Sequence, residues 1–329
     1  MNRYSVENLS REGFQVIHLI DKESDSKAEI VPGIGNNLFQ FKSFGKSIIS
    51  APDNLETLKN ETFANFKYGT PILFPPNRVK DGSFTFKGRK YHLPINEPPS
   101  NHLHGELCSR PWEISDYGTS NDKGAYVTCT FSYSKYPDIL SYFPHELLFS
   151  VTYALLNGKL LMKTRITNKG EDEAPFAFGL HPYFNIPYEK EEEILLTIPS
   201  ENEWPVTNEA FVTGEPSNTS FSKELNKGVN IANYPKLGCS LVTIKDHNFP
   251  CRIDLKNNDY SIFFEIDKKF PFVVLFRPDW ASSYSIEPYT YVTDAFNLPF
   301  NEAVSGVQGL NPGESLVYQT KLWIKTKAL

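Results

Sequence analysis

Apolar and polar positions alternate along most of this chain over strand-length stretches, which is the pattern of half-buried β-strands. The clearest case is residues 125–133, and residues 147–156 and 159–167 are two further runs separated only by Asn157-Gly158. Asn-Gly strongly favours a two-residue hairpin because both turn positions take positive φ. Other strands are expected at residues 14–20, 37–44, 83–86, 90–93, 193–198, 240–244, 251–255, 260–266, 271–277 and 316–325.

Helical patterns are few. Residues 53–61, after Pro52, predict one short helix, and residues 138–142 predict another turn. No linker, composition shift or internal repeat divides the chain. Strands joined by hairpins and loops throughout predict an all-β fold, with one large antiparallel β-sandwich in a single domain spanning residues 1–329.

The composition agrees with a strand-rich fold and narrows the class of protein. The chain has 25 Phe and 17 Tyr, which favour strands, and its formal net charge of −6 contains no strong basic block. Nucleic acid and anionic membranes are therefore not expected as partners. The polar N-terminus predicts no signal peptide, and no apolar window is long enough for a transmembrane helix. Four dispersed cysteines without Cys-x-x-Cys spacing predict neither disulfides nor a zinc site, and they indicate the reducing cytoplasm.

Three segments interrupt the series of strands and are predicted to be loops: residues 68–79, 97–111 and 278–299. They are rich in Pro, Asn, Gly and aromatic residues. Functional residues are often carried on loops that a rigid sheet holds in place, so we expect the site in these segments and near the histidine described next.

His181 lies in the aromatic stretch Phe-Gly-Leu-His-Pro-Tyr-Phe-Asn-Ile-Pro, residues 178–187. Pro182 restricts the backbone of His181 to extended conformations, and Tyr183 and Phe184 supply flat apolar surface. Two interpretations stay open from these residues. His181 is either a general acid that faces a sugar or a core histidine bonded to a backbone carbonyl.

Glu287 stands in an otherwise apolar and aromatic run. A carboxyl group in such surroundings tends to have a raised pKa, which suits a general base near neutral pH. The alternative is an ion pair with an arginine such as Arg277 that stabilises a corner of the fold.

Asn77 and Arg78 follow a stiff, proline-rich apolar run that could present the guanidinium group to substrate hydroxyls or a carboxylate. The alternative is a surface arginine after a turn. In Asn-His-Leu-His-Gly, residues 101–105, alternation would place His102 and His104 on one side of an extended segment. No further ligands stand at metal-binding spacing, so no metal is predicted. Nucleotide, serine-hydrolase and zinc-peptidase motifs are also absent, so no cofactor is expected.

Four motifs in order make the chain resemble the aldose 1-epimerase (mutarotase) family. They begin with Pro-Asn-Arg-Val at 76–79 and Asn-His-Leu-His-Gly at 101–105. They continue with Gly-Leu-His-Pro-Tyr-Phe at 179–184 and end with Ile-Glu-Pro-Tyr-Thr at 286–290. The resemblance implies a galactose mutarotase-like β-supersandwich with a cleft for a monosaccharide and no metal or organic cofactor.

The resemblance also implies roles for particular residues. Glu287 matches the catalytic base, His181 the catalytic acid and His104 a second active-site histidine. Asn77 and Arg78 match substrate contacts. In the implied reaction, a carboxylate and an imidazole on opposite sides of a hemiacetal open the sugar ring by proton transfer.

Two further substrate contacts are expected, and there are departures from the family pattern. Tyr183 could pack on the C–H face of the sugar. Asp246, in Asp-His-Asn-Phe, matches a substrate-binding aspartate in its residue letters, but its position between two predicted strands favours a hairpin turn over that role. Val274 replaces a glutamine that often precedes the last motif, and Glu106 replaces a second glycine after His104. The acid–base pair is intact, so these departures put the identity of the sugar in doubt.

The predicted function is therefore the interconversion of the α and β anomers of a hexose. One alternative is a hexose-6-phosphate 1-epimerase in which Arg78, Arg277 or a nearby lysine receives the phosphate. Another is a non-catalytic carbohydrate-binding protein. The expected partner is a monosaccharide, and the expected state is a monomer or homodimer in the cytoplasm.

Overall fold

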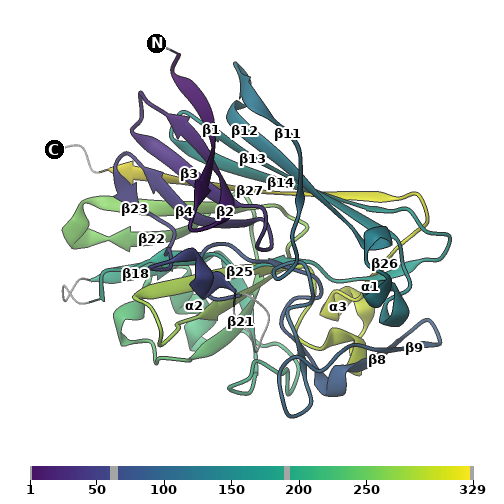
Figure 1. Ribbon diagram of the computed structural model, residues 1–329. Coiled ribbons are helices and arrows are strands. Elements are labelled where there is room, and N and C mark those ends of the chain that lie inside the picture. The colour runs from purple at the N-terminus through teal and green to yellow at the C-terminus, as the bar shows by residue number, and fades with distance from the viewer. Residues whose placement is uncertain (1, 60–65, 189–192, 327–329) are drawn as a thin grey trace.

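The structure, a computed structural model, describes residues 2–59, 66–188 and 193–326. Within these residues the chain is mostly antiparallel strand, arranged in three larger sheets and three two-stranded ones (Figure 1). The first larger sheet has the order β1 (Tyr4–Arg11), β2 (Phe14–Asp21), β3 (Ser26–Val31), β4 (Asn37–Ser43) and β5 (Lys46–Ser47).

The other two larger sheets take up most of the remaining chain. The nine-stranded sheet has the order β11 (Glu113–Ser120), β12 (Gly124–Ser132), β13 (Leu147–Leu156), β14 (Lys159–Asn168), β27 (Ser315–Thr326), β23 (Tyr260–Ile266), β22 (Cys251–Leu255), β18 (Ile194–Thr197) and β20 (Val229–Asn230). The seven-stranded sheet has the order β19 (Ser200–Trp204), β21 (Cys239–Ile244), β24 (Phe272–Phe276), β25 (Ser283–Tyr289), β16 (Gly179–Leu180) and β6 (Ile72–Leu73), with β17 (Tyr183–Asn185) also paired with β25.

Short elements complete the described chain. The two-stranded sheets pair β7 (Arg78–Val79) with β10 (His102–Leu103), β8 (Ser83–Phe86) with β9 (Arg89–His92), and β15 (Ala174–Phe176) with β26 (Gln308–Leu310). The α-helices are α1 (Pro137–Tyr142), α2 (Ser220–Leu225) and α3 (Glu302–Ser305). The 3-10 helices include η1 (Leu55–Leu58), η2 (Lys80–Gly82), η3 (Tyr133–Lys135), η5 (Ile231–Asn233), η6 (Lys256–Asn258) and η7 (Ala295–Asn297).

The predicted all-β class is confirmed, and the strands expected from alternation are present within a residue or two of their expected ends. The Asn157-Gly158 hairpin joins β13 to β14, with φ values of 52° and 70° at the two turn residues. The helix expected at residues 53–61 is only the 3-10 helix η1, and its last two residues lie outside the described part. The turn expected at 138–142 is α1.

Two expectations about the chain path were wrong. The segment 278–299, predicted to be a loop, contains β25, which lies inside the seven-stranded sheet. Residues 283–287 do alternate between polar and apolar, but Pro288 within the run favoured a loop, and in the structure even the polar residues of β25 are buried. The link between β21 and β22 is not a hairpin, because β21 belongs to the seven-stranded sheet and β22 to the nine-stranded one.

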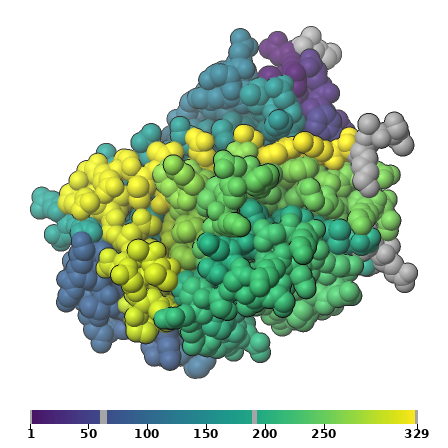
Figure 2. Space-filling model, turned by 180° about the vertical axis from the view of Figure 1, so that it is seen from behind, coloured from purple at the N-terminus to yellow at the C-terminus, as the bar shows by residue number. Residues whose placement is uncertain are grey.

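The main hydrophobic core lies between the larger sheets. It includes side chains from all three, such as Phe41 of β4, Phe149 of β13 and Ile286 of β25. The five-stranded sheet packs on the nine-stranded one through contacts of β2 with β12 and β13. Figure 2 shows the back of the molecule, where the yellow C-terminal segment crosses below the projecting N-terminal and 110–130 regions.

The seven-stranded sheet has a different environment on each face. On β24 and β25, Val273, Leu275 and Ile286 face the main core. Successive residues of a strand point to opposite faces. Val274 and Tyr289 therefore belong to the other face, where a second apolar cluster lies. This second face carries the candidate site.

Candidate active site

A cleft of about 500 Å³ lies on this second face of the seven-stranded sheet. Five of the residues expected from the sequence line it together: Asn77, Arg78, His104, His181 and Glu287. They come from segments that are far apart in the chain, so the fold brings them to one place.

Glu287 is positioned by its place on β25. Residues 285, 287 and 289 share the face of the strand opposite Ile286. Val274 of β24 stands directly across from Glu287 in the ladder, and Phe276 stands across from Ser285. Val274 and Phe276 also line the cleft, so β24 places two apolar side chains beside the carboxyl group.

His181 lies between β16 and β17, as the proline after it predicts. Its backbone N–H donates to Pro71 O at 3.0 Å. The ring stacks on Tyr183, with centroids 4.4 Å apart, and its Nδ1 atom lies 2.9 Å from Ser285 Oγ. His181 is 3% exposed and faces the cleft, so it is not a core histidine bonded only to a carbonyl.

His181 Nε2 lies 3.3 Å from Glu287 Oε1. The two groups are therefore side by side on the floor of the cleft, and the expectation that they stand on opposite sides of a hemiacetal was wrong. The alternative pairing of Glu287 with Arg277 is also absent. The Arg277 guanidinium donates to the backbone carbonyls of Ala232 and Tyr234 instead.

Burial shifts the proton affinities of this pair in opposite directions. It raises the pKa of Glu287 to about 8, although hydrogen bonds from Tyr289 and Ser285 oppose that shift. Burial also lowers the pKa of His181 to about 3. Desolvation disfavours the charged form of each group. Near neutral pH the pair therefore holds one proton, and its net charge is zero.

His104 reaches the cleft through an unusual backbone conformation, with φ at +62°. Gly105 follows at φ +68°, and a Cβ there would stand 1.8 Å from Phe74 O, so only glycine fits. The ring nitrogen Nδ1 accepts a hydrogen bond from the Asn77 N–H at 3.0 Å. Burial, and next the nearby His181, keep the pKa of His104 well below its usual value, so the ring is neutral.

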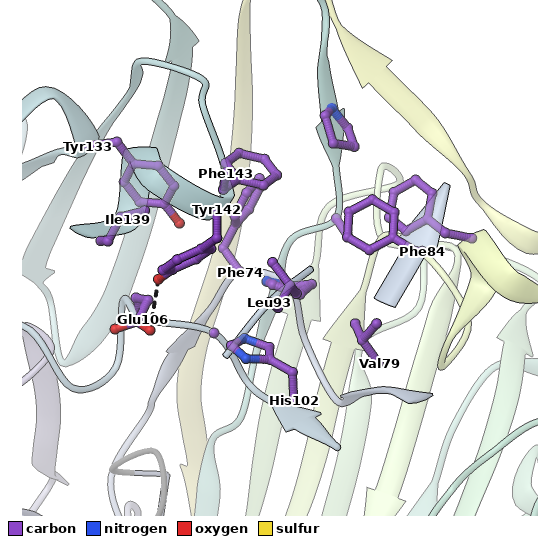
Figure 3. A pocket seen from close by; sticks show the side chains of 15 residues that line it. Phe74, Val79, Phe84, Leu93, His102, Glu106, Tyr133, Ile139, Tyr142 and Phe143 are labelled. Atoms are coloured by element: carbon purple, nitrogen blue, oxygen red, sulfur yellow. Dashed lines mark hydrogen bonds between the residues drawn. The ribbon is translucent and has the colours of Figure 1, made fainter. Parts of the chain in front are cut away.

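His102 and His104 do not share one side of the segment, contrary to expectation. The left-handed turn at His104 breaks the extended path on which that expectation depended. His102 instead bonds through Nδ1 to Pro94 O at 2.7 Å and lines a separate, small apolar cavity with Glu106 and Tyr142. Figure 3 shows His102 pointing into this cavity and the hydrogen bond between Tyr142 and Glu106.

Asn77 and Arg78 form one rim of the cleft. The Arg78 guanidinium makes a two-pronged ion pair with Glu97, with N–O distances of 2.7 and 2.6 Å, and also donates to Glu209 O. The Arg78 side chain is therefore fixed at the cleft by these hydrogen bonds and is not a freely solvated surface arginine. The Asn77 side-chain oxygen accepts from the Arg78 N–H at 2.9 Å.

Tyr183 does not present its ring to the cleft. Its side chain is completely buried beneath His181, and its hydroxyl lies 3.1 Å from His181 Nε2. The aromatic residues that line the cleft are Phe66, Phe276 and Trp280. Tyr183 therefore supports the histidine, and the expectation that it packs on the sugar was wrong.

Asp246 does not reach the cleft. It lies in the link between β21 and β22, where its side chain accepts from the Asn248 backbone N–H at 2.9 Å. It is absent from the residues that line the cavity. Its carboxylate stabilises a turn, so the assignment of Asp246 to substrate binding was wrong.

Several residues in or beneath the site were missed from the sequence. Ser285 and Tyr289 stand two positions on either side of Glu287, so a period of two would have identified them if residues 283–289 had been recognised as a strand. Trp280 and Lys236 line the cleft. No sequence signal marks Lys236, which the tertiary structure alone brings to the site.

Across residues 2–59, 66–188 and 193–326, there is no group of three or more His, Cys, Asp or Glu side chains arranged to hold a metal ion. Over the same ranges, no helix has the length and hydrophobicity needed to cross a membrane.

The fold and the cleft define a class of protein. A galactose mutarotase-like protein from Clostridium acetobutylicum has a solved structure that superposes with a TM-score of 0.89, at 27% identity over 99% of both chains. The described architecture is thus the galactose mutarotase-like β-sandwich. The chain belongs to the aldose 1-epimerase family, whose model matches residues 19–323.

Relatives of known sequence agree with this membership. The Escherichia coli protein YihR is 29% identical over 188 residues, which cover 56% of this chain and 55% of that protein. Galactose mutarotase from Mus musculus is 28% identical over 195 residues, which cover 55% of this chain and 51% of that enzyme. The matched residues thus span about half the length of each of these relatives.

Proposed function

We propose that this protein is an aldose 1-epimerase that interconverts the α and β anomers of a hexose. The observation that carries the proposal is the buried contact between His181 Nε2 and Glu287 Oε1, 3.3 Å apart on the floor of a sugar-sized cleft. A carbohydrate-binding protein without activity has no need of such a pair.

Adjacent placement of the two groups suits the chemistry of a hemiacetal. The hydroxyl oxygen O1 and the ring oxygen O5 are bonded to the same carbon, so groups side by side can reach both. Glu287 takes the proton from O1 while His181 gives a proton to O5. The ring opens to the aldehyde, the C1–C2 bond rotates, and closure in reverse returns both protons. Each group is expected to contribute roughly 10²–10⁴-fold.

The proton content of the pair fits this cycle. With one proton between them, the two groups always offer one donor and one acceptor, whichever of the two holds the proton. Transfer across the 3.3 Å contact converts carboxyl plus imidazole into carboxylate plus imidazolium. The second arrangement is the one that takes the proton from O1 and protonates O5.

The neighbouring groups are placed to bind the sugar. Arg78, held by Glu97, and neutral His104 can donate hydrogen bonds to oxygens that gain negative charge as the ring opens. The ring of Trp280 offers an apolar face for the C–H side of the sugar. Asn77 completes the polar rim.

A second candidate is epimerisation of a hexose that carries an anionic group, such as a hexose 6-phosphate. Three cations surround Trp280: Lys67 stacks over its ring at 4.8 Å, and Lys236 and Arg277 line a polar hollow that adjoins the cleft. Lys236 and Trp280 line both the cleft and the hollow. Asp279 also lines the hollow, but the three cations outnumber it, and in a chain of net charge −6 this local excess of positive charge favours an anionic substituent.

Polarimetry tests the activity. Relaxation of fresh α-glucose, α-galactose and hexose 6-phosphates is followed with the wild type, Glu287→Gln and His181→Asn. We expect the wild type to accelerate at least one sugar and each variant to lose roughly 10²-fold or more. No acceleration of any sugar would refute the proposal, and full activity of Glu287→Gln would refute the assignment of the base.

The same assay separates the two candidates. A preference for hexose 6-phosphates that is lost in Lys236→Met, but kept in the exposed control Lys227→Met, supports the anionic substrate. Equal rates for neutral and phosphorylated sugars in all three proteins exclude it. We also propose that the chain acts as a single domain in the cytoplasm, as a monomer or homodimer, which size-exclusion chromatography and cell fractionation test.

A further inference from the structure

We propose that Ser285 is a positioning residue that holds His181 in the Nδ1–H tautomer, while the backbone amide of Asn77 holds His104 in the opposite, Nε2–H tautomer. The two cleft histidines, with ring centroids 5.4 Å apart, would then do different work. The consequence for rate rests on the proposed function, but the tautomers themselves do not.

The tautomer of His104 follows from its partner. The Asn77 backbone N–H lies 3.0 Å from His104 Nδ1. A peptide N–H can only donate, so Nδ1 must present its lone pair. A neutral imidazole carries a single proton, which is therefore on Nε2. The backbone N–H of His104 also donates to the backbone oxygen of Asn77 at 3.0 Å. The two hydrogen bonds together fix the His104 ring relative to the Asn77 backbone.

The tautomer of His181 follows from the position of the Ser285 hydroxyl. Ser285 Oγ lies 2.9 Å from His181 Nδ1 and 2.8 Å from Pro182 O. The Pro182 carbonyl oxygen can only accept, and the Glu287 carboxyl group is a second acceptor for this hydroxyl, so the hydroxyl proton goes to one of these two oxygens. The Ser285 oxygen is then free to accept from Nδ1–H. If the hydroxyl donated to Nδ1 instead, the bond to Pro182 would be lost in a completely buried site.

In this tautomer the lone pair of His181 Nε2 points toward the Glu287 carboxyl group. The Tyr183 hydroxyl lies 3.1 Å from Nε2, and Glu287 Oε1 lies 3.3 Å from it. His181 can therefore accept a proton from Glu287 at Nε2 and deliver it there. Nδ1–H stays bonded to Ser285 in both charge states, so the ring does not need to turn during the reaction.

His104 has the complementary limitation. Its Nδ1 lone pair is engaged by a backbone amide, and its Nε2 already carries a proton. In the neutral state it can therefore donate a hydrogen bond but cannot take a proton from a substrate. The geometry makes His104 a fixed donor to a sugar oxygen and leaves proton transfer to His181 and Glu287.

The position of Ser285 is itself fixed by the sheet. It stands across from Tyr183 of β17 on one side and across from Phe276 of β24 on the other. Ser283 offers a matched control. It is also completely buried on β25, on the same face two residues earlier, and its hydroxyl has no hydrogen-bond partner among the described residues.

Nitrogen-15 NMR of the full-length protein labelled at histidine tests the tautomers. In the wild type we expect one cleft histidine with a protonated Nδ1 and one with a protonated Nε2, assigned by His181→Asn and His104→Asn. Ser285→Ala should convert His181 to a mixture of tautomers, and Ser283→Ala should not. If His181 carries its proton on Nε2, or if His104 carries its proton on Nδ1, the proposal is overturned.

Kinetics tests the consequence for catalysis. For Ser285→Ala we expect kcat to fall roughly tenfold with KM changed less than about twofold, because the bond orients the catalytic ring without touching the sugar. Ser283→Ala should keep the wild-type values. An unchanged kcat in Ser285→Ala would overturn the positioning role. If no sugar is epimerised by the wild type, the proposed function fails, and the wild-type NMR spectrum still decides the tautomers.

Discussion

Tyr289 donates a hydrogen bond to Glu287 Oε2 from the same face of β25, two residues further along the strand. The tyrosine ring is completely buried and packs closely against Gly179. A Cβ atom added to Gly179 would lie only 2.5 Å from the ring. The hydroxyl is thus held against one carboxyl oxygen of Glu287, while the other oxygen, Oε1, lies by His181.

Removal of this hydroxyl should move the alkaline limb of the pH–rate profile. The bond lowers the pKa of Glu287, so Tyr289→Phe should raise that pKa and shift the limb upward by roughly one pH unit. Measurement of kcat/KM against pH checks the shift. Tyr284→Phe is the control, because Tyr284 is equally buried on the other face of β25 and its hydroxyl has no partner in the described chain. A limb that stays in place in Tyr289→Phe would contradict the prediction.

The wild-type profile itself should reflect a pair that holds one proton. The pair loses its single proton as the pH passes about 8, and it gains a second one only below about 3. Activity should therefore stay flat through the mildly acidic range and halve near the upper value, without a step at the ordinary pKa of histidine. An acid limb close to the ordinary histidine value would show that His181 titrates independently, against this expectation.

Glu287 should also reduce the stability of the fold at high pH. Its pKa is raised from 4.5 in the unfolded chain to about 8 in the folded protein. The folded state binds this proton more tightly, so its stabilising contribution is complete below pH 4.5 and is lost as the pH rises toward 8. Glu287→Gln does not titrate, so its free energy of unfolding should exceed that of the wild type by roughly 1–3 kcal/mol in mildly alkaline buffer and by much less in acid. Urea unfolding at the two pH values tests this, and an equal difference at both would count against it.

The ion pair of Arg78 with Glu97 should affect substrate binding more than turnover. Glu97→Gln removes the charge that holds the guanidinium at the cleft, so KM should rise roughly five- to tenfold with a smaller change in kcat. Glu113→Gln breaks an ion pair with Lys135 in which both side chains are more than half exposed, and it should change neither constant. Equal kinetics of Glu97→Gln and the wild type would mean that Arg78 does not depend on its partner.

Gly105 should tolerate no side chain. Gly105→Ala combines a left-handed backbone with a clash against Phe74 O, so we expect a loss of roughly 2–4 kcal/mol and a displaced His104. Gly88→Ala is the matched control, because Gly88 has φ +82° but open space around it, and roughly 1 kcal/mol is expected there. Thermal unfolding and kcat measure the two effects. Similar losses in both variants would show that strain alone, without the clash, explains Gly105.

Much of the fold could be predicted from local patterns. The alternation over residues 125–133 and the Asn157-Gly158 turn identify β12 to β14, because a strand with one buried face must place its apolar residues at every second position. The restricted backbone before Pro182 likewise indicated the extended path through His181. The family motifs brought Asn77, Arg78, His104, His181 and Glu287 together as candidates, and the fold places all five at one cleft.

Other features depended on contacts between distant segments. Residues 283–287 of β25 alternate between polar and apolar, but Pro288 and the surrounding aromatic, proline-containing segment favoured a loop, so Ser285 and Tyr289 were not identified as neighbours of Glu287. Tyr183 and Asp246 have residue types suited to a sugar site, but burial and the path of the chain exclude them from the cleft.

The sequence by itself therefore determined the central acid, base and polar residues of the site and most of the longer strands, because both depend on side-chain type and local backbone preference. Only the tertiary structure decided that Glu287 and His181 stand side by side and share one proton. That outcome depends on the register of β25 and on complete burial, which are set by residues far away in the chain.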